Sequence, residues 1–377
     1  MPDQNRADSQ SQHVYVPAGM PAMDTSGKPT SFFEFWPIWL IYFPVAVQWA
    51  LLSLRYRSLT LPLIANPAVP LSGMVGVHKS EVFRRAGERA SGWILPWIDY
   101  QVSAEAGSEQ ITRVLQSLRD RGLELPIVAK PSMGCRGAGV KLLQHEQALC
   151  DYLEDFPVGG MIQFQQPAAW EAEAGVFYVR HPDSGSGEIT SLTLKYMPYV
   201  VGDGASTLAQ LVDQDPRAGR LAHLYRQRHE ESWDSVLAQG QPYRLVFSAS
   251  HCRGAVFRDG RQYITDALSK TLDVIFDDIP GFHYGRLDIK FRDLESLQSG
   301  ENFAIIEING ASSEAIHIWD RNSSLAEAMT TLLGQYRTLF RLGHANRRLG
   351  HQPPGLRALW DAWRCESRLV KQYPAND

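Results

Sequence analysis

The sequence lacks several features that define common classes of protein. None of its four cysteines is part of a C-x-x-C pair, so neither a zinc site nor a disulfide framework is predicted, and a reducing compartment is expected. The net charge of −4 is far from the strongly basic balance of a dedicated nucleic-acid binder, so nucleic acid is not an expected partner. The chain does not begin with a basic segment, and its first apolar run starts too late for a secretory signal.

The remaining composition is that of an ordinary globular protein. The 377 residues are 44% hydrophobic and 21% charged, and a chain of this length suits two or three packed subdomains. Residues 1–30 are an exception, because they are rich in Gln, Ser, Asp and Pro and have no periodic apolar pattern. They are predicted to form a disordered tail.

Residues 36–54 form an apolar segment without a charged side chain, and Arg55 and Arg57 follow it directly. The segment is long enough to span a bilayer, and the two arginines would then place the rest of the chain in the cytoplasm. Pro37 and Pro44 argue against a span, and aromatic-rich segments of this kind also lie in the membrane interface or pack on the protein itself. All three interpretations remain open, and docking on the protein's own core is preferred.

Hydrophobic periodicity predicts a mixture of helices and strands along the rest of the chain. Helical patterns lie at 109–121, 208–213, 218–231 and 324–340. Strand patterns lie at 127–129, 160–164, 176–180, 189–196, 245–250, 254–257, 285–291 and 303–308. This mixture predicts a protein of the α/β (α+β) class.

The most informative pattern is a set of polar residues on two strand-like segments. Glu307 and Asn309 lie two residues apart at the end of an apolar strand, so their side chains are expected on one face. Asp288 lies in the preceding strand-like segment. If the two strands pair, three oxygen ligands converge, and these are the ligands that Mg²⁺ uses when it also holds phosphate. The alternative is a pair of solvated strand ends.

A glycine-rich loop follows the strand that ends with Lys130. Gly134, Gly137 and Gly139 permit backbone angles that point successive N–H groups inward, as in an anion-binding nest. The lysine beside this loop can reach phosphate oxygens. The spacing matches neither the G-K-[ST] ending of the Walker pattern nor the dinucleotide pattern G-x-G-x-x-G. A plain hairpin is the alternative.

The order of these features resembles the ATP-grasp superfamily, and most closely the branch with D-alanine–D-alanine ligase and uncharacterised carboxylate–amine ligase-like proteins. The resemblance covers about residues 75–335, and its most specific motifs are GRLDIKF at 285–291 and IIEINGASSEAIHIWD at 305–320. It implies a fold in which two α+β subdomains hold ATP between them, preceded by an N-terminal α/β region. The implied boundaries are 31–123 for the N-terminal region, 124–200 for the lid subdomain, 201–335 for the central subdomain with the metal site, and 336–377 for a basic helical tail.

The resemblance also implies a role for individual residues. In the nucleotide site, Lys79 and Lys130 would hold ATP phosphates, and the loop with Gly134, Gly137 and Gly139 would close over them. Gln163 and Phe164 would lie at the adenine edge. Glu173, or its competitor Glu171, would bind the ribose. The family usually has an acidic residue where Gln163 stands. Lys195 would contact the terminal phosphate, Arg286 would stabilise charge at the reacting centre, and Asp288, Glu307 and Asn309 would bind Mg²⁺, or Mn²⁺ in its place. The loop 310–314 would face the reacting carboxylate and the acceptor amine.

These features together predict an ATP-dependent carboxylate–amine ligase that acts through an acyl phosphate on an amino acid or small acid. Its partners would be a small-molecule carboxylate and an amine, and its location would be the cytoplasm, with membrane contact through 36–54 left open. One alternative is an ATP-grasp kinase for a small molecule. Another is a nucleotide-binding regulator without catalytic activity.

Overall fold

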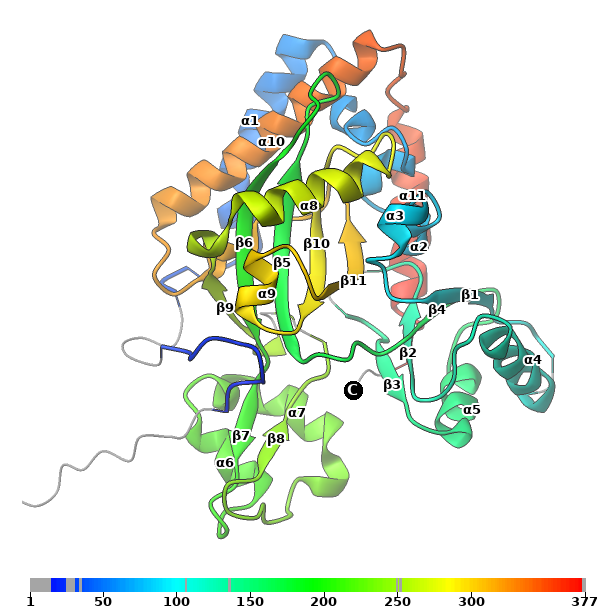
Figure 1. Cartoon of the computed structure of the whole chain (residues 1–377), viewed down its shortest axis with the longest axis vertical. Coiled ribbons are helices and arrows are strands. Elements are labelled where there is room, and N and C mark those ends of the chain that lie inside the picture. Colours follow the sequence, from blue (N-terminus) through cyan, green and yellow to red (C-terminus); the bar gives the residue numbers. More distant parts are fainter. Residues whose placement is uncertain are drawn as a thin grey trace, which may run out of the picture.

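The computed structural model describes residues 15–24, 31–33, 36–105, 107–134, 137–248, 250 and 253–374. Residues 1–14 and 25–30 of the predicted tail lie outside the described residues. Two antiparallel sheets, each with its own helices and its own buried cluster, account for most of the chain (Figure 1). The mixed α/β (α+β) class predicted from the sequence is therefore confirmed.

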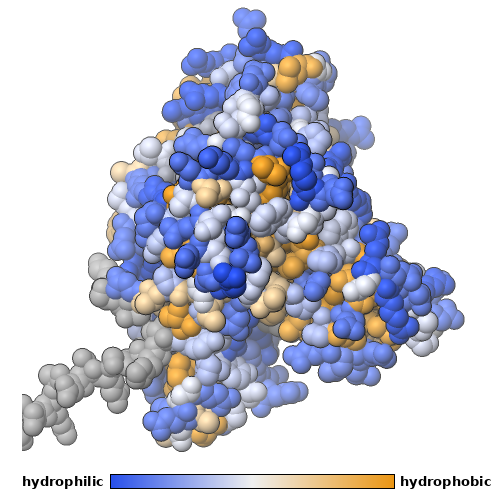
Figure 2. Space-filling model, viewed as in Figure 1, coloured by the Kyte–Doolittle hydropathy of each residue, from blue (hydrophilic) through white to orange (hydrophobic). Residues whose placement is uncertain are grey.

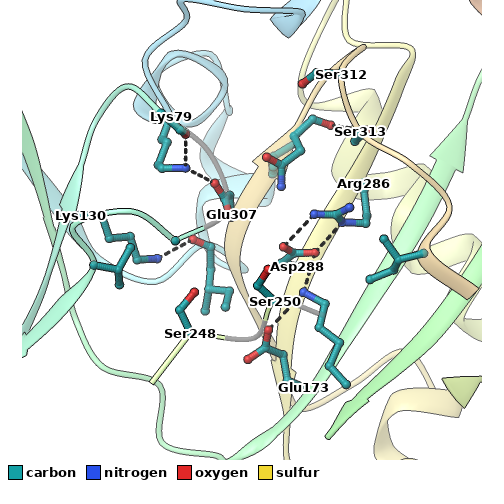
Figure 3. A pocket seen from close by; sticks show the side chains of 18 of the residues that line it. Lys79, Lys130, Glu173, Ser248, Ser250, Arg286, Asp288, Glu307, Ser312 and Ser313 are labelled. Atoms are coloured by element: carbon teal, nitrogen blue, oxygen red, sulfur yellow. Dashed lines mark hydrogen bonds and ion pairs between the residues drawn. The ribbon is translucent and has the colours of Figure 1, made fainter. Parts of the chain in front are cut away.

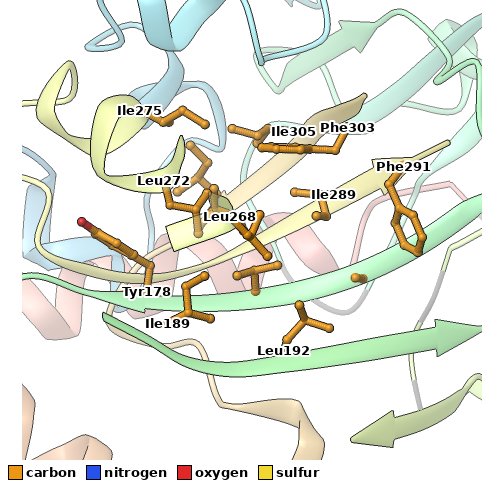
Figure 4. Packing of buried hydrophobic residues seen from close by; sticks show 14 of the residues in the cluster. Tyr178, Ile189, Leu192, Leu268, Leu272, Ile275, Ile289, Phe291, Phe303 and Ile305 are labelled. Carbon is orange, nitrogen blue, oxygen red and sulfur yellow. The ribbon is translucent and has the colours of Figure 1, made fainter. Parts of the chain in front are cut away.

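The larger sheet has five strands in the order β11-β10-β5-β6-β9. They are β5 (Ala172–Val179), β6 (Glu188–Tyr196), β9 (Val256–Asp259), β10 (Tyr284–Phe291) and β11 (Phe303–Asn309). One face of this sheet packs on α8 (Asp266–Asp277) and α9 (Leu294–Gln298) (Figure 4). Leu268 and Leu272 of α8 form one buried cluster with Leu192 and Ile289 of the strands. Because strand side chains alternate, the residues between these apolar positions point to the opposite face.

The opposite face of the five-stranded sheet is covered at one end by α10 (Leu325–Arg348). Phe177 and Tyr284 of the sheet are buried together with Leu339 and Leu342 of α10. The helix begins where the Ser324 side chain accepts a hydrogen bond from the Glu327 N–H, which satisfies one of the free donors of its first turn. The other end of this face is left for a cavity.

The smaller sheet has four strands in the order β1-β4-β2-β3. They are β1 (Trp97–Gln101), β2 (Ile127–Pro131), β3 (Lys141–Leu143) and β4 (Met161–Gln165). The helices α4 (Gly107–Arg119) and α5 (Glu146–Glu154) cover it, and Val114 and Leu149 from these helices are fully buried with Ile127 and Phe164 from the strands. β1 comes from the region 31–123, so this sheet combines that region with residues 124–200.

A third and smaller unit has its own buried cluster around Leu208, Tyr225 and Leu245. It contains β7 (Tyr199–Val201), β8 (Pro242–Arg244), α6 (Leu208–Gln214), α7 (Ala222–Arg228), η3 (Ala218–Leu221) and η4 (Glu230–Ser232). The remaining elements are η1 (Leu61–Ile64), η2 (Pro70–Gly73), α2 (Ser80–Phe83), α3 (Glu88–Ser91), η6 (Arg261–Tyr263), η7 (Ile316–Trp319) and α11 (Leu356–Val370). In the view of Figure 2 the surface is mostly hydrophilic, and apolar side chains gather toward the junction of the two sheets.

Residues 15–24 differ from the disordered tail that the sequence predicts. Met20 is buried in the cluster beneath the five-stranded sheet, and the Tyr196 hydroxyl donates a hydrogen bond to the carbonyl of Pro21 at 2.9 Å. The rings of Tyr15 and Tyr199 lie 4.5 Å apart. This segment packs because its partners lie about 175 residues away in the sequence, which local composition does not reveal.

The apolar segment forms one helix, α1 (Ile38–Tyr56), which lies alongside α10 (Figure 1). By length and composition it is the one helix among the described residues that could cross a membrane. Ile41 and Val45 are buried in a cluster with Leu332 of α10, whereas most of the helix surface is exposed. Docking on the protein's own core therefore describes only one face of α1.

Candidate active site

A cavity of about 770 Å³ lies between the two sheets. Its lining comes from β2, the hinge after β4, the strands β5, β6, β10 and β11, and the first turns of α1. The polar face of the five-stranded sheet supplies most of its charged groups (Figure 3). The cavity brings together most of the residues that the sequence analysis singled out: Lys79, Lys130, Gly134, Gly137, Glu173, Lys195, Arg286, Asp288, Glu307 and Asn309.

The centre of the site is a pair of carboxylates on neighbouring strands. Asp288 on β10 lies directly opposite Glu307 on β11, and Arg286 lies opposite Asn309. The pairing therefore places the three polar residues of the metal prediction on adjacent positions of two strands. A register shift follows directly after Asp288, so the apolar residues beyond it still face the buried cluster.

Two cations hold Asp288 in its ionised form. Its carboxylate accepts from Nε of Arg286 at 2.8 Å and lies 2.9 Å from Nζ of Lys195. Burial alone would raise the pKa of Asp288, but the guanidinium and the ammonium outweigh it and hold the pKa well below the ordinary aspartate range. The carboxylate is charged at every physiological pH.

Glu173 on β5 joins the same network from the next strand. Its carboxylate contacts Nζ of Lys195 at 3.1 Å and Nζ of Lys290 at 2.9 Å. Burial opposes ionisation of Glu173, yet the two lysines lower its pKa. The side chain is almost fully buried, so its negative charge is stabilised by the two lysines and hardly by water.

Among the described residues, Glu307 forms its ion pair with the ammonium of Lys79 (Figure 3). This ammonium also donates a hydrogen bond to the carbonyl of Gly134 at 3.2 Å, so it connects the carboxylate pair with the glycine-rich loop. Burial would raise the pKa of Glu307, and the lysine charge outweighs it, so the pKa is lowered. Lys79 thus contacts both the glycine-rich loop and Glu307, one of the candidate metal ligands.

Lys130 enters the cavity from β2 in the other sheet. Its ammonium donates to Oε1 of Gln165 at 2.6 Å and to the carbonyl of Ile306 at 3.0 Å. Burial lowers its pKa to about 8, which the negative charge of Glu307 only partly offsets. It has no carboxylate within ion-pairing distance among the described residues, and a phosphate group would supply the missing negative charge.

The residues predicted as metal ligands fit a hard divalent cation. Asp288 and Glu307 provide two ionised carboxylates, and Asn309 provides an amide whose Nδ2 is buried without a hydrogen-bond partner. Asn oxygen and nitrogen positions are interchangeable in such an assignment, so the amide oxygen can face the same site. Among the described residues no group of three His, Cys, Asp or Glu side chains forms a metal site, so any cation here would need the amide or substrate oxygens.

The glycine-rich loop is only partly in the cavity. Gly134 and Gly137 line it, and Gly139 does not. Gly137 has a φ of +70°, and a Cβ there would meet Oγ of Ser248 at 2.4 Å, so the position requires glycine. Gly139 has a φ of +68°, and its carbonyl accepts a hydrogen bond from the Tyr152 hydroxyl at 2.7 Å. Gly139 thus shapes the loop rather than the cavity wall.

The residues predicted at the adenine edge are not part of the cavity lining. Gln163 and Phe164 are buried inside the four-stranded sheet and do not line the cavity. The cavity wall instead begins two residues later, at Gln165, and continues through 166–168 to Trp170 and Glu171. Strand β4 ends at Gln165, so the backbone becomes free to bind a ligand only beyond that residue.

Glu314 belongs to the loop 310–314, but no individual role was predicted for it from the sequence. It lines the cavity; Arg286 donates to its backbone carbonyl at 3.3 Å, and within the described residues its carboxylate accepts one hydrogen bond, from Nε1 of Trp319 at 3.3 Å. Burial raises the pKa of Glu314 to about 7. The signal in the sequence was its place in the loop 310–314 after Asn309, but the cavity around it is also lined by residues of α1 and η7, which the sequence does not place there.

The end of the cavity near Glu314 is apolar. It is lined by Trp36, Ile38, Ile41 and Tyr42 at the start of α1, by Phe257 of β9, and by Ile316 and Trp319 of η7. The cavity lining therefore combines lysines that suit a polyanion with a set of apolar side chains.

Comparison with known proteins gives a weak structural likeness. No family model matches the chain, and no curated protein matches it at a significant level. Among solved structures, a bifunctional glutathione synthetase from Pasteurella multocida is 14% identical with a TM-score of 0.34, over 68% of this chain and 35% of that one. D-alanine–D-alanine ligases from Coxiella burnetii and Bacillus anthracis are 9% and 11% identical, with TM-scores of 0.37 and 0.38.

The matches to the two ligases cover 80% and 75% of this chain and 64% and 72% of theirs. The chain thus spans about a third of the glutathione synthetase and less than two thirds of the Coxiella burnetii ligase. Similarity this low assigns no activity. The chemistry has to come from the site itself.

Proposed function

We propose that the protein is an ATP-dependent carboxylate–amine ligase of the ATP-grasp type. The observation that carries this proposal is the placement of Asp288 and Glu307 opposite each other, in one cavity with Lys130 and with Lys79, which is ion-paired with Glu307. Paired carboxylates suit a divalent cation, and Lys130 of the four-stranded sheet and Lys79 at the start of α2 suit the phosphates that this cation would hold. The glycine-rich loop, whose Gly134 carbonyl contacts Lys79, would provide backbone N–H donors for the same anion.

In this proposal the chain's own residues position ATP and stabilise developing charge. Lys130 and Lys79 would bind the phosphates, and a cation on Asp288, Glu307 and Asn309 would neutralise phosphate oxygens when bound. An oxygen of the substrate carboxylate attacks the γ-phosphorus, and ADP leaves with its electron pair. Arg286 lies beside Asp288 and would stabilise negative charge on the acyl group.

The second step joins the acyl phosphate to an amine. The amine nitrogen attacks the acyl carbon, inorganic phosphate leaves, and the nitrogen must lose a proton. Glu314 would take this proton, since it lines the cavity, its carboxylate forms no ion pair among the described residues, and its pKa is raised to about 7. Water would hydrolyse the acyl phosphate, so the loop with Gly134 and Gly137 has to close over it.

A library of carboxylic acids combined with amines tests the proposal, with ADP as the readout and mass spectrometry of the product. Release of ADP only when an acid and an amine are both supplied, with an amide as product, is the expected result. ADP release that requires a hydroxyl compound instead, with a phosphate ester as product, would show a small-molecule kinase. Absence of nucleotide binding would contradict both and favour a different function.

Replacing Glu314 with Gln should remove one ionisation from the pH dependence of amide formation. In the wild type, kcat/KM for the amine should rise as pH increases through about 7, because the pKa of Glu314 is raised and only its ionised form accepts a proton. The variant should be slower by about 10²-fold or more at pH 8 and should lose this rise. Ionisation of the free amine affects both enzymes equally.

Glu301→Gln is the matched control for this prediction, because Glu301 is exposed at the turn before β11 and away from the cavity. It should keep the wild-type profile. A Glu314→Gln variant with an unchanged rate and an unchanged pH profile would contradict the role of Glu314.

A further inference from the structure

The outward surface of α1 is a continuous apolar face that is left exposed by the part of the chain that the structure describes. It consists of Trp39, Phe43, Val47, Leu51 and Leu54, which recur at helical spacing and have exposed fractions of 67%, 64%, 46%, 62% and 76%. Phe32, just before the helix, extends this face and contacts Trp36 with a ring separation of 4.9 Å. A helix that is apolar on all sides is normally buried on all sides, so an exposed apolar face of this kind indicates a surface that contacts another apolar phase or molecule.

The opposite face of α1 is held firmly on the protein. Ile41 and Val45 are buried, and the Trp49 ring lies 5.3 Å from Phe340 of α10 in an edge-to-face arrangement. Arg347 of α10 donates to the carbonyl of Tyr56 at 3.0 Å, which fixes the last turn. A membrane-spanning α1 would have to leave these contacts and expose the α10 surface, so the packing excludes a span in the folded chain.

The charged side chains of α1 and of residues 328–348 of α10 are all arginines. Arg55 follows Leu51 by four residues and continues the same stripe, and Arg57 lies just beyond the helix. Arg337, Arg341 and Arg348 are exposed on α10, whose Tyr336 and Phe340 contact α1. Neither α1 nor residues 328–348 of α10 contain an acidic residue. These five arginines form no ion pair with the part of the chain that the structure describes.

We propose that α1 rests in the interface of an anionic lipid bilayer, with its apolar face among the acyl chains and its arginines at the phosphates. A bilayer of this kind supplies both a hydrocarbon layer and negative charge, and tryptophan is well suited to the boundary between them. A second copy of the chain would supply an apolar surface but no negative charge. A two-fold contact through this face would bring the arginines of one copy against the same arginines of the other.

Sedimentation with vesicles tests this proposal in the full-length protein. The wild type should pellet with phosphatidylcholine vesicles that contain phosphatidylglycerol, and more weakly with phosphatidylcholine alone or at high salt. The triple variant Trp39→Ser, Phe43→Ser and Leu51→Ser should bind about a hundredfold more weakly. Its melting temperature should stay near that of the wild type, because these side chains are exposed.

The control is a triple variant at exposed apolar positions away from α1: Val158→Ser, Val236→Ser and Val274→Ser. It should bind vesicles like the wild type. Arg55→Gln with Arg57→Gln should lose the preference for phosphatidylglycerol and keep the weaker binding to neutral vesicles. No binding by the wild type to either vesicle would overturn the proposal, as would equal binding by the two serine variants. A dimer in light scattering that the α1 variant abolishes, without vesicle binding, would assign the face to a second copy instead.

Discussion

Replacing Glu307 with Gln is expected to abolish turnover and leave the fold intact. The substitution keeps the shape of the side chain but removes the negative charge that would face a divalent cation, which prefers a carboxylate oxygen. A loss of about 10³-fold or more in kcat is expected, because phosphoryl transfer depends on neutralised phosphate oxygens. The effect on stability should be small, since Glu307 is partly exposed and pairs with a single lysine.

The measurement combines ADP formation with urea unfolding of the same variant. Glu301→Gln, on the surface beyond the other end of β11, is the control and should match the wild type in both. Near-normal activity of Glu307→Gln at saturating Mg²⁺ would contradict the assignment of Glu307 as a metal ligand.

Asp288→Asn should lose activity as well, but it should also destabilise the protein strongly. Asp288 is the carboxylate partner of Arg286 and one of two partners of Lys195, and its side chain is almost fully buried. Removing one member of a buried ion pair leaves uncompensated charge, which costs about 3 kcal/mol or more. Glu307→Gln should lower the free energy of unfolding far less, although Glu307 lies directly opposite Asp288 on the neighbouring strand.

The free energy of unfolding in urea at pH 7 tests this difference. Because the pKa of Asp288 is depressed in the folded protein, its contribution is complete above the ordinary aspartate range and declines as pH falls below about 4. The stability gap between the wild type and Asp288→Asn should therefore narrow in acid. A gap below about 1 kcal/mol at pH 7 would show that the network around Asp288 does not hold the sheet together.

Local pattern in the sequence was sufficient to predict the central part of the site. The period of two along strands fixes the shared face of Glu307 and Asn309, and pairing of β10 with β11 adds Asp288. These features depend on residues that are close in sequence or on two neighbouring strands. The position of Lys130 beside them was expected only from the resemblance to the ATP-grasp superfamily, because its contact with the carbonyl of Ile306 joins residues 176 apart in the sequence.

Features that depend on contacts distant in sequence could not be predicted in the same way. Gln163 and Phe164, predicted at the adenine edge, do not line the cavity, because β4 stays paired with β1 and β2 up to Gln165. The raised pKa of Glu314 arises from burial at an end of the cavity partly lined by α1. The packing of Met20 likewise depends on strands far along the chain.

Calorimetric titration of the protein with a non-hydrolysable ATP analogue, with and without Mg²⁺, tests most directly whether the cavity binds ATP phosphates. One nucleotide per chain should bind only with Mg²⁺, and the affinity should fall as pH rises above about 8, because Lys130 then loses the proton that attracts phosphate. Lys130→Ala should weaken binding by about tenfold or more, whereas Lys290→Ala should weaken it less, because Lys290 is already paired with Glu173 at 2.9 Å. Equal losses in the two variants, or no nucleotide binding by the wild type, would contradict a phosphate site between Lys130 and the glycine-rich loop.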